Sequence, residues 1–493
     1  MTLADYSSPR LWCLTALLAS QAGCLALPGV GGEEVVPVRP PVSALVPVRF
    51  DAPADTLPSP RAVEQQKAAD KLESGRGLTL DQAINATLLH DPKIRAGLEL
   101  IAQANGDALT ASLSPNPTLS VNQTLLPLTR PFTVDRQGGP PQLDVGVAYP
   151  IDWCVFGKQA AMMVSAGLGV RVSEADFADL IRQRVRETSQ EFYNVLEARA
   201  LLELARNDLQ TKQQTEEIIR KARAAGGRTE VDLDRIRLET LLSRQVVRES
   251  EANVSSSVSR LRALTGRRDF EALGVAGELG DAPKDPVPDL RDAVSLAQKN
   301  RPDIRSDHWK IAQADADTRV EDVKACPEVT TRIGYTRQFQ QKAIGFPDAD
   351  SYGVGVDISL PICNRNQGNR LKARSVASQR RHELEGDLVD LRSEVELIVV
   401  EYRTALRTAE VYADVQTELA RKVRDRIQEA FRLGSRTLLE VLDAQRAYRE
   451  TLRSSINSRA AAWRALYKLR SATGSQVSTH ERTVPEPVPP AGK

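Results

Sequence analysis

The sequence predicts a mainly helical chain that contains two copies of one unit, each with long helices and a pair of β-strands. Three observations predict this fold class: a duplicated pattern of residues, long stretches without proline, and short segments in which apolar and polar residues alternate. Of the 493 residues, 41% are apolar, which excludes global disorder. Lys and Arg together number 66 against 65 Asp and Glu, a balance that argues against nucleic acid as a partner.

The hydropathy of the chain excludes one class of membrane protein. Mean hydropathy is −0.33, and no apolar run approaches the roughly 20 residues of a membrane-spanning helix, so a helical transporter is excluded. A membrane β-barrel is not excluded, because apolar and polar residues alternate along its strands and average out.

Residues 1–24 resemble an export signal. Arg10 precedes an apolar stretch, residues 11–19, which is too short for a membrane anchor. The following Ala22-Gly23-Cys24 resembles the end of a bacterial lipoprotein signal, in which Cys24 would be lipidated; cleavage nearby without a lipid is the alternative. Residues 25–77, rich in proline and valine, are expected to form a linker, either ordered or a flexible tether.

The remaining cysteines and the histidines form no recognisable site. Cys154, Cys326 and Cys363 lack metal-ligand spacing and are expected to be isolated buried thiols; a Cys154–Cys363 bridge is the alternative, since both occupy similar places in the duplicated unit. The histidines also lack ligand spacing: His90, His308, His382 and His480. The sequence contains no P-loop, G-x-S-x-G or H-E-x-x-H motif, so nothing in it supports an enzyme, a cofactor or a metal centre.

The duplication covers most of the chain. At one constant offset, Leu80, Ala83, Pro92, Ile94 and Arg95 return as Leu290, Ala293, Pro302, Ile304 and Arg305. Further along, Gly226–Thr229 matches Gly434–Thr437. The units therefore span residues 78–266 and 288–474, joined by a Pro-rich connector, residues 267–287, and followed by residues 475–493, an expected disordered tail.

Each unit is expected to begin with one helix, capped by Thr79 or Asp289, followed by two strands, a very long helix, a turn and a second long helix. Residues 160–222 contain no proline and would extend about 95 Å as one helix. In the second unit, apolar positions step by four and three without a break: Leu391, Val395, Ile398, Tyr402, Ala405, Ala409, Tyr412, Gln416 and Leu419. Such rods must pack against helices of this chain or of other copies.

The predicted strands lie near residues 119–125, 143–149, 329–339 and 352–360. Each is about ten residues long, as a tilted strand that crosses a bilayer must be, but a half-buried sheet in a soluble protein alternates in the same way. Four strands cannot close a barrel, so the membrane interpretation requires strands from other subunits. In such a barrel Asp144, Arg332 and Asp357 would face the lumen and Arg337 the rim, with loops 127–141 and 341–349 outside the cell.

From about residue 78 to 474 the chain resembles the TolC-like outer-membrane efflux proteins. Residues 433–444, Leu-Gly-Ser-Arg-Thr-Leu-Leu-Glu-Val-Leu-Asp-Ala, are similar to the second helix-hairpin tip of that family, and Ala472-Thr473-Gly474 is similar to its closing segment. The resemblance implies a homotrimer in which each subunit adds four strands to one barrel in outer-membrane lipid, continued by a helical tunnel in the periplasm. The tunnel would dock on a periplasmic adaptor that joins it to an inner-membrane pump.

A narrower resemblance concerns the substrate. Residues 360–368, Leu-Pro-Ile-Cys-Asn-Arg-Asn-Gln-Gly, are similar to the segment after the fourth strand in outer-membrane components of cobalt-zinc-cadmium efflux systems. This implies passive export of divalent metal cations. The alternatives are a duct for drugs or organic solutes, and a soluble periplasmic coiled-coil adaptor or scaffold.

The two chain reversals are the expected docking tips. They contain Gly226, Gly227, Arg228 and Thr229 in the first unit, and Gly434, Ser435 and Thr437 in the second. Glycine tolerates the positive φ that a helix stop requires, whatever the turn does. The resemblance implies that the adaptor binds here.

Arg436, Glu440 and Asp443 are the expected gate residues. Glu440 and Asp443 are three apart and therefore share a helix face, so three copies would form a ring of six carboxylates that concentrates cations. The resemblance implies that Arg436 takes part in polar contacts that hold the entrance closed. An ordinary solvated face on a charged helix is the alternative.

Overall fold

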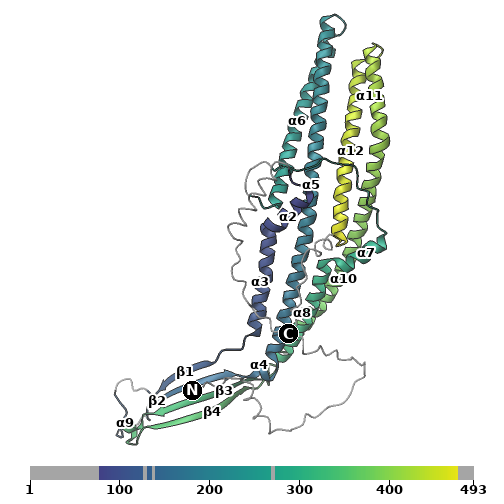
Figure 1. Cartoon of the computed structure of the whole chain (residues 1–493). Coiled ribbons are helices and arrows are strands. Elements are labelled where there is room, and N and C mark those ends of the chain that lie inside the picture. Colours follow the sequence, from purple (N-terminus) through teal and green to yellow (C-terminus); the bar gives the residue numbers. More distant parts are fainter. Residues whose placement is uncertain (1–76, 126–129, 136–138, 268–272, 476–493) are drawn as a thin grey trace, which may run out of the picture. The chain divides into compact units, whose positions relative to one another are not determined.

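The computed structural model describes residues 77–125, 130–135, 139–267 and 273–475 (Figure 1), all within one unit that spans residues 66–493. The expected export signal, the lipidation site Cys24, nearly all of the linker, His480 and nearly all of the C-terminal tail lie outside the described residues.

The order of elements confirms the duplication. The first repeat contains α2 (Leu80–His90), α3 (Pro92–Ser112), β1 (Thr118–Thr124), β2 (Gln142–Pro150), α4 (Asp152–Val155), α5 (Lys158–Ala224) and α6 (Glu230–Leu264). The second contains α7 (Leu290–Asn300), α8 (Pro302–Lys324), β3 (Glu328–Gln338), α9 (Gln340–Ile344), β4 (Ala349–Ser359), α10 (Gln367–Glu410), a π-helical turn η2 (Val411–Gln416), α11 (Thr417–Arg432) and α12 (Leu438–Ala472).

The expected single opening helix is wrong in both repeats, because two helices meet at an elbow. In the first repeat Asp91 has ψ 120° and its carboxylate accepts a hydrogen bond from the Lys93 N–H at 2.8 Å, so it caps α3. In the second repeat Arg301 has ψ 127°. Each is followed by proline, which disfavours helical ψ in the residue before it and has no N–H to continue the helix.

The long helices are confirmed, with one interruption. Helix α5 runs for 67 residues, about 100 Å. In the second repeat Leu391, Val395 and Ile398 are buried as predicted, but the unbroken period is wrong, since η2 separates α10 from α11. A π-turn adds a residue to the turn and rotates the apolar stripe, and Leu419 beyond it is exposed.

The strands form one antiparallel sheet in the order β1-β2-β3-β4. Val145 pairs with Val121 and Tyr335, while its neighbour Asp144 pairs with Asn122 and Thr336. Partners in register share a face, so one face of the sheet is apolar and the other polar. The apolar face is largely exposed, most of all at Val354 (83%).

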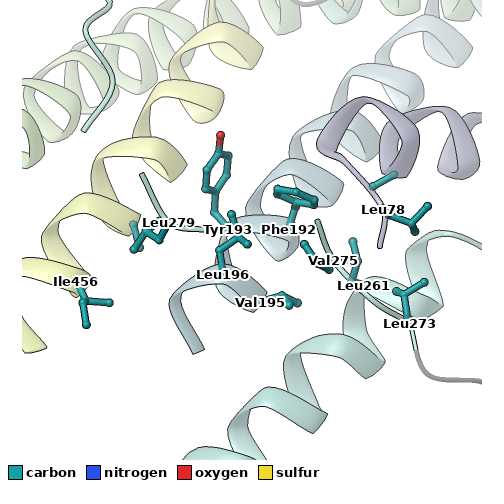
Figure 2. Packing of buried hydrophobic residues seen from close by; sticks show 12 residues of the cluster. Leu78, Phe192, Tyr193, Val195, Leu196, Leu261, Leu273, Val275, Leu279 and Ile456 are labelled. Carbon is teal, nitrogen blue, oxygen red and sulfur yellow. The ribbon is translucent and has the colours of Figure 1, made fainter. Parts of the chain in front are cut away.

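The helical core lies where α5, α6 and α12 meet. Phe192, Tyr193 and Leu196 of α5 pack near Leu261 and Ile456 (Figure 2). The ring of Tyr193 also stacks on that of Trp463, with centroids 5.1 Å apart. A second cluster joins α7, α8, α10 and α12. No helix in the described ranges is both long and apolar enough to cross a membrane.

Candidate functional site

The two hairpin tips end their first helices with the same hydrogen bonds. In the first tip the N–H of Gly226 donates to the Arg223 carbonyl at 2.8 Å, and the N–H of Gly227 to Ala222 at 2.9 Å. In the second tip the N–H of Gly434 donates to Phe431 at 3.0 Å, and that of Ser435 to Ala430 at 2.9 Å. This is the Schellman pattern of a helix that stops at a left-handed residue.

Gly226 and Gly434 are the left-handed residues, each with φ +78°. Nothing lies within 4 Å of the position that a Cβ would occupy in either glycine. Glycine is therefore required at these positions by the backbone conformation and not by crowding from neighbouring atoms. Gly227 does not have a positive φ, and its counterpart in the second tip is Ser435.

The next helices also begin alike. Thr229 and Asp232 form a capping box at the start of α6, as Thr437 and Glu440 do at the start of α12. The N–H of Thr437 donates to the Glu440 carboxylate at 2.8 Å, and the N–H of Glu440 donates to Thr437 Oγ1 at 3.4 Å. The duplicated Thr is therefore a helix cap in both tips.

Glu440 is thus both a cap and a charged surface group. Its carboxylate also accepts a hydrogen bond from Arg436 Nη1 at 2.7 Å. Hydrogen bonds from the Thr437 backbone and from Arg436 hold the pKa of Glu440 below its usual range. The side chain therefore keeps its negative charge to a lower pH than an ordinary glutamate.

Asp443 and Glu440 contact different arginines. Asp443 lies 3.5 Å from Arg446, whereas Arg436 pairs with Glu440. Arg446 also bonds Glu239 of α6 at 3.0 Å, so it connects Asp443 to the first hairpin. The sequence does not point to Arg446, because its partner comes from another helix and depends on the register between the two.

Glu239 belongs to a polar cluster between the hairpins. Lys212 of α5 is buried and donates to Glu239 at 2.6 Å, while Asp208 of α5 pairs with Arg449 of α12 at 2.9 Å. Burial would raise the pKa of Glu239, but the hydrogen bond and charge of Lys212 outweigh it and hold the pKa low. The cluster ties α12 to α5 and α6.

The tips also share an apolar core. Ile219, Leu233 and Ile236 of the first hairpin pack with Leu438 and Leu442 of the second. Beside them the guanidinium of Arg228 lies 4.3 Å from the ring centre of Phe431. Arg228 therefore holds the first tip against the second hairpin through a cation–π contact.

The charged strand residues occupy the predicted faces. Asp144, Arg332 and Asp357 lie on the polar face, where Arg332 and Asp357 form an ion pair. Arg337 lies on the apolar face near its end, 3.6 Å from Asp348.

The cysteine expectations need correction. Cys154, Cys326 and Cys363 are free thiols, so no bridge joins Cys154 to Cys363. They are also not buried, since Cys154 in α4 and Cys363 between β4 and α10 are exposed and Cys326 is half-buried. Among the described residues no group of three or more His, Cys, Asp or Glu side chains could hold a metal ion.

Comparison with known proteins extends over both repeats. Residues 293–475 match the family model "Outer membrane efflux protein". Two relatives are the cobalt-zinc-cadmium resistance protein CzcC of Cupriavidus metallidurans, 24% identical over 76% of this chain and 84% of its own length, and the pyoverdine export outer membrane protein OpmQ of Pseudomonas aeruginosa, 22% identical over 80% of this chain and 85% of its own.

A solved structure shares the fold. The CmeC outer membrane channel of Campylobacter jejuni superimposes with a TM-score of 0.68 at 15% identity, over 82% of this chain and 89% of the channel. The family match lies in the second repeat, and the first repeat has the same order of short helices, strand pair and long hairpin.

Proposed function

We propose that this protein is the outer-membrane exit duct of a tripartite efflux system. The observation that carries the proposal is the sheet, whose apolar face is exposed while its two edge strands, β1 and β4, have no further partner among the described residues. An apolar face suits lipid, and strands from two further copies would provide partners for the open edges. The polar face would then line the lumen.

The long hairpins would continue the duct as a periplasmic tunnel. Their tips, Gly226–Thr229 and Gly434–Thr437, would dock on a periplasmic adaptor bound to an inner-membrane pump, which supplies the energy. Docking would separate the hairpins, and the contacts that resist separation include Arg228 on Phe431 and Arg446 on Glu239. Glu440 and Asp443 would present carboxylates to the passing solute.

Divalent metal cations are the proposed substrate. The segment 360–368 and the similarity to CzcC support this choice, and an acidic entrance attracts cations. The similarity to OpmQ, named for pyoverdine export, keeps an organic solute as the second candidate.

A resistance assay separates the two candidates. The gene would be expressed in a metal-sensitive strain together with an adaptor and a pump of the cobalt-zinc-cadmium type. The outer-membrane component that normally accompanies this pump would be left out. Restored growth in cobalt, zinc or cadmium supports the proposal. Restored export of an organic solute by a matched drug pump, without any metal resistance, would contradict the choice of substrate.

Extraction tests the duct against a periplasmic scaffold. The mature protein should stay in the membrane fraction after high-salt and carbonate washes and should enter solution only with detergent. Release by salt alone would favour the scaffold.

A further inference from the structure

The polar face of the sheet differs in charge between its two ends. Among the described strand residues on this face, four carry a charge: Asp144 of β2, Glu328 and Arg332 of β3, and Asp357 of β4. Arg332 and Asp357 form an ion pair and cancel one another. Glu328 begins β3 at the end of the sheet nearest the long helices, whereas Asp144 lies toward the opposite end.

Two neutral donors hold the Asp144 carboxylate in place. Thr336 Oγ1 of β3 donates to its Oδ1 at 2.5 Å, and Gln142 Nε2 donates to the same oxygen at 2.7 Å. Among the described residues no Lys, Arg or His forms an ion pair with this carboxylate. Hydrogen bonds from neutral groups position a carboxylate without cancelling its charge. Asp144 is therefore fixed and uncompensated, whereas Asp357 is neutralised.

The neighbouring residues on the polar face leave this charge unscreened. Toward the helices, the next row across the sheet consists of one serine and three glycines: Ser120, Gly146, Gly334 and Gly353. Arg332 lies four residues from Thr336, about 13 Å along the strand. The Debye length in 0.1 M salt is about 10 Å, so Arg332 contributes little at Asp144.

We propose that Asp144 selects cations within the barrel, as a second ring of carboxylates separate from Glu440 and Asp443 at the tips. The inference rests on the proposed function, in which three copies close one barrel and the polar face lines its lumen. Three Asp144 side chains would then surround the pore at one height, near the outer mouth, because β2 begins at Gln142. A ring of fixed negative charge concentrates cations and opposes anions.

The two rings differ in what holds them. Docking of the adaptor would separate the hairpins and carry Glu440 and Asp443 with them, whereas the hydrogen bonds of β2 with β1 and β3 keep Asp144 in place. Helix α5, about 100 Å long, separates the strands from the hairpin tip. This distance is many Debye lengths, so the two rings act independently. The barrel would therefore keep its preference for cations while the entrance is open.

Reversal potentials in planar bilayers, recorded under a salt gradient, test the inference. Asp144→Asn removes the charge and keeps the shape of the side chain. Thr336→Lys keeps Asp144 and gives it a cationic partner, as Arg332 is to Asp357. The control is Asp350→Asn, the same change at the same end of the sheet but on the apolar face, where Asp350 pairs with Arg337.

Asp144→Asn and Thr336→Lys should each lower the ratio of cation to anion permeability at least about twofold in 0.1 M salt. The loss should vanish near 1 M salt, where the Debye length is about 3 Å. Combined with Glu440→Gln and Asp443→Asn, Asp144→Asn should remove selectivity that the tip variant retains. Asp350→Asn should match the wild type, and stable channels in each case would show that the variant folds and assembles.

Two results would overturn the ring at Asp144 and leave the duct intact. One is a permeability ratio that neither Asp144→Asn nor Thr336→Lys changes, and the other is an equal loss in Asp350→Asn. A wild-type protein that forms no channels would instead overturn the proposed duct.

Discussion

The two elbows hold the same geometry with opposite charges. At the first, Asp91 pairs with Arg184 of α5, with Oδ2 and Nε 2.8 Å apart. At the second, Arg301 pairs with Glu394 of α10, with Nη1 and Oε2 2.5 Å apart. The offset that relates Pro92 to Pro302 also relates Arg184 to Glu394, so acid and base have exchanged places between the repeats.

This exchange lets each elbow distinguish the long helix of its own repeat from the similar long helix of the other repeat. If the first elbow packed on α10, Asp91 would meet Glu394, and if the second packed on α5, Arg301 would meet Arg184. Asp91 and Arg301 are both buried, where like charges are costly. The difference therefore directs each elbow residue, Asp91 or Arg301, to the long helix of its own repeat.

Beside the elbows the repeats differ in polarity. In the first, Gly97 of α3 lets Leu180 of α5 approach so closely that a Cβ would lie 2.6 Å from Leu180 Cδ2. Gly97 also lies beside Phe177 of α5, and in the second repeat the equivalents of Gly97 and Phe177 are Asp307 and Asp387. Burial and the neighbouring Asp307 raise the pKa of Asp387.

The two hairpin tips differ less from each other than the two elbows do. They share the Schellman turn and the capping box, but the offset that relates Gly226 to Gly434 places Arg235 where the second tip has Asp443. Only the second hairpin can therefore supply two carboxylates on that helix face.

The largest expected effect comes from reversing the charge of one partner in an elbow ion pair. Arg184→Glu places a carboxylate against the buried Asp91 and should destabilise the protein by about 3–5 kcal/mol. Thermal unfolding in detergent, followed by circular dichroism, would measure the loss. The double variant D91R/R184E gives the first elbow the polarity of the second and should recover most of it; an equal loss in the double variant would refute pairing as the cause.

Substitution of the left-handed glycine in each tip should lower stability, whereas substitution of the next glycine should not. Gly226→Val or Gly434→Val forces a β-branched residue to φ +78° and should cost about 1–2 kcal/mol. Gly227→Ser copies the second tip and should be nearly neutral. Differential scanning calorimetry compares the three variants, and equal losses at positions 226 and 227 would show that the backbone is not the reason for glycine.

The smallest expected effect concerns the acidic pair at the second elbow. Because the pKa of Asp387 is raised in the folded protein, its contribution to stability is greatest at low pH and declines as pH rises through that pKa. Asp387→Asn should therefore stabilise the protein near pH 7 by at most about 0.5 kcal/mol and have little effect near pH 4. Unfolding measured at both pH values checks this, and a stabilisation equal at both would exclude titration of Asp387.

The parts of the fold that follow from local periodicity could be predicted from the sequence. The faces of Asp144, Arg332 and Asp357 follow from the period of two in a strand, and α5 follows from the absence of proline. The repeated Gly-x-Arg-Thr predicts the two chain reversals, whereas the capping boxes at Thr229 and Thr437 and the helix starts at Pro92 and Pro302 are seen only in the structure.

The candidate site was predicted less well, because its contacts depend on how the helices pack. Arg446 bonds Glu239, and Lys212 is buried, only because α6 and α12 both pack against α5 in one register. No local sequence pattern predicts the π-turn at Val411–Gln416. The partner of Arg436 was partly foreseeable, since Glu440 is four residues away on the same face.

Conductance in planar bilayers tests the central claim, that this chain assembles into a cation-attracting duct, most directly. The wild-type protein extracted in detergent should form stable, cation-selective channels, and Glu440→Gln with Asp443→Asn should reduce the selectivity without abolishing conductance. Because the pKa of Glu440 is held low, selectivity should persist as pH falls to the usual pKa of a glutamate and decline only below it. A folded, detergent-extracted protein that forms no channels would contradict the account.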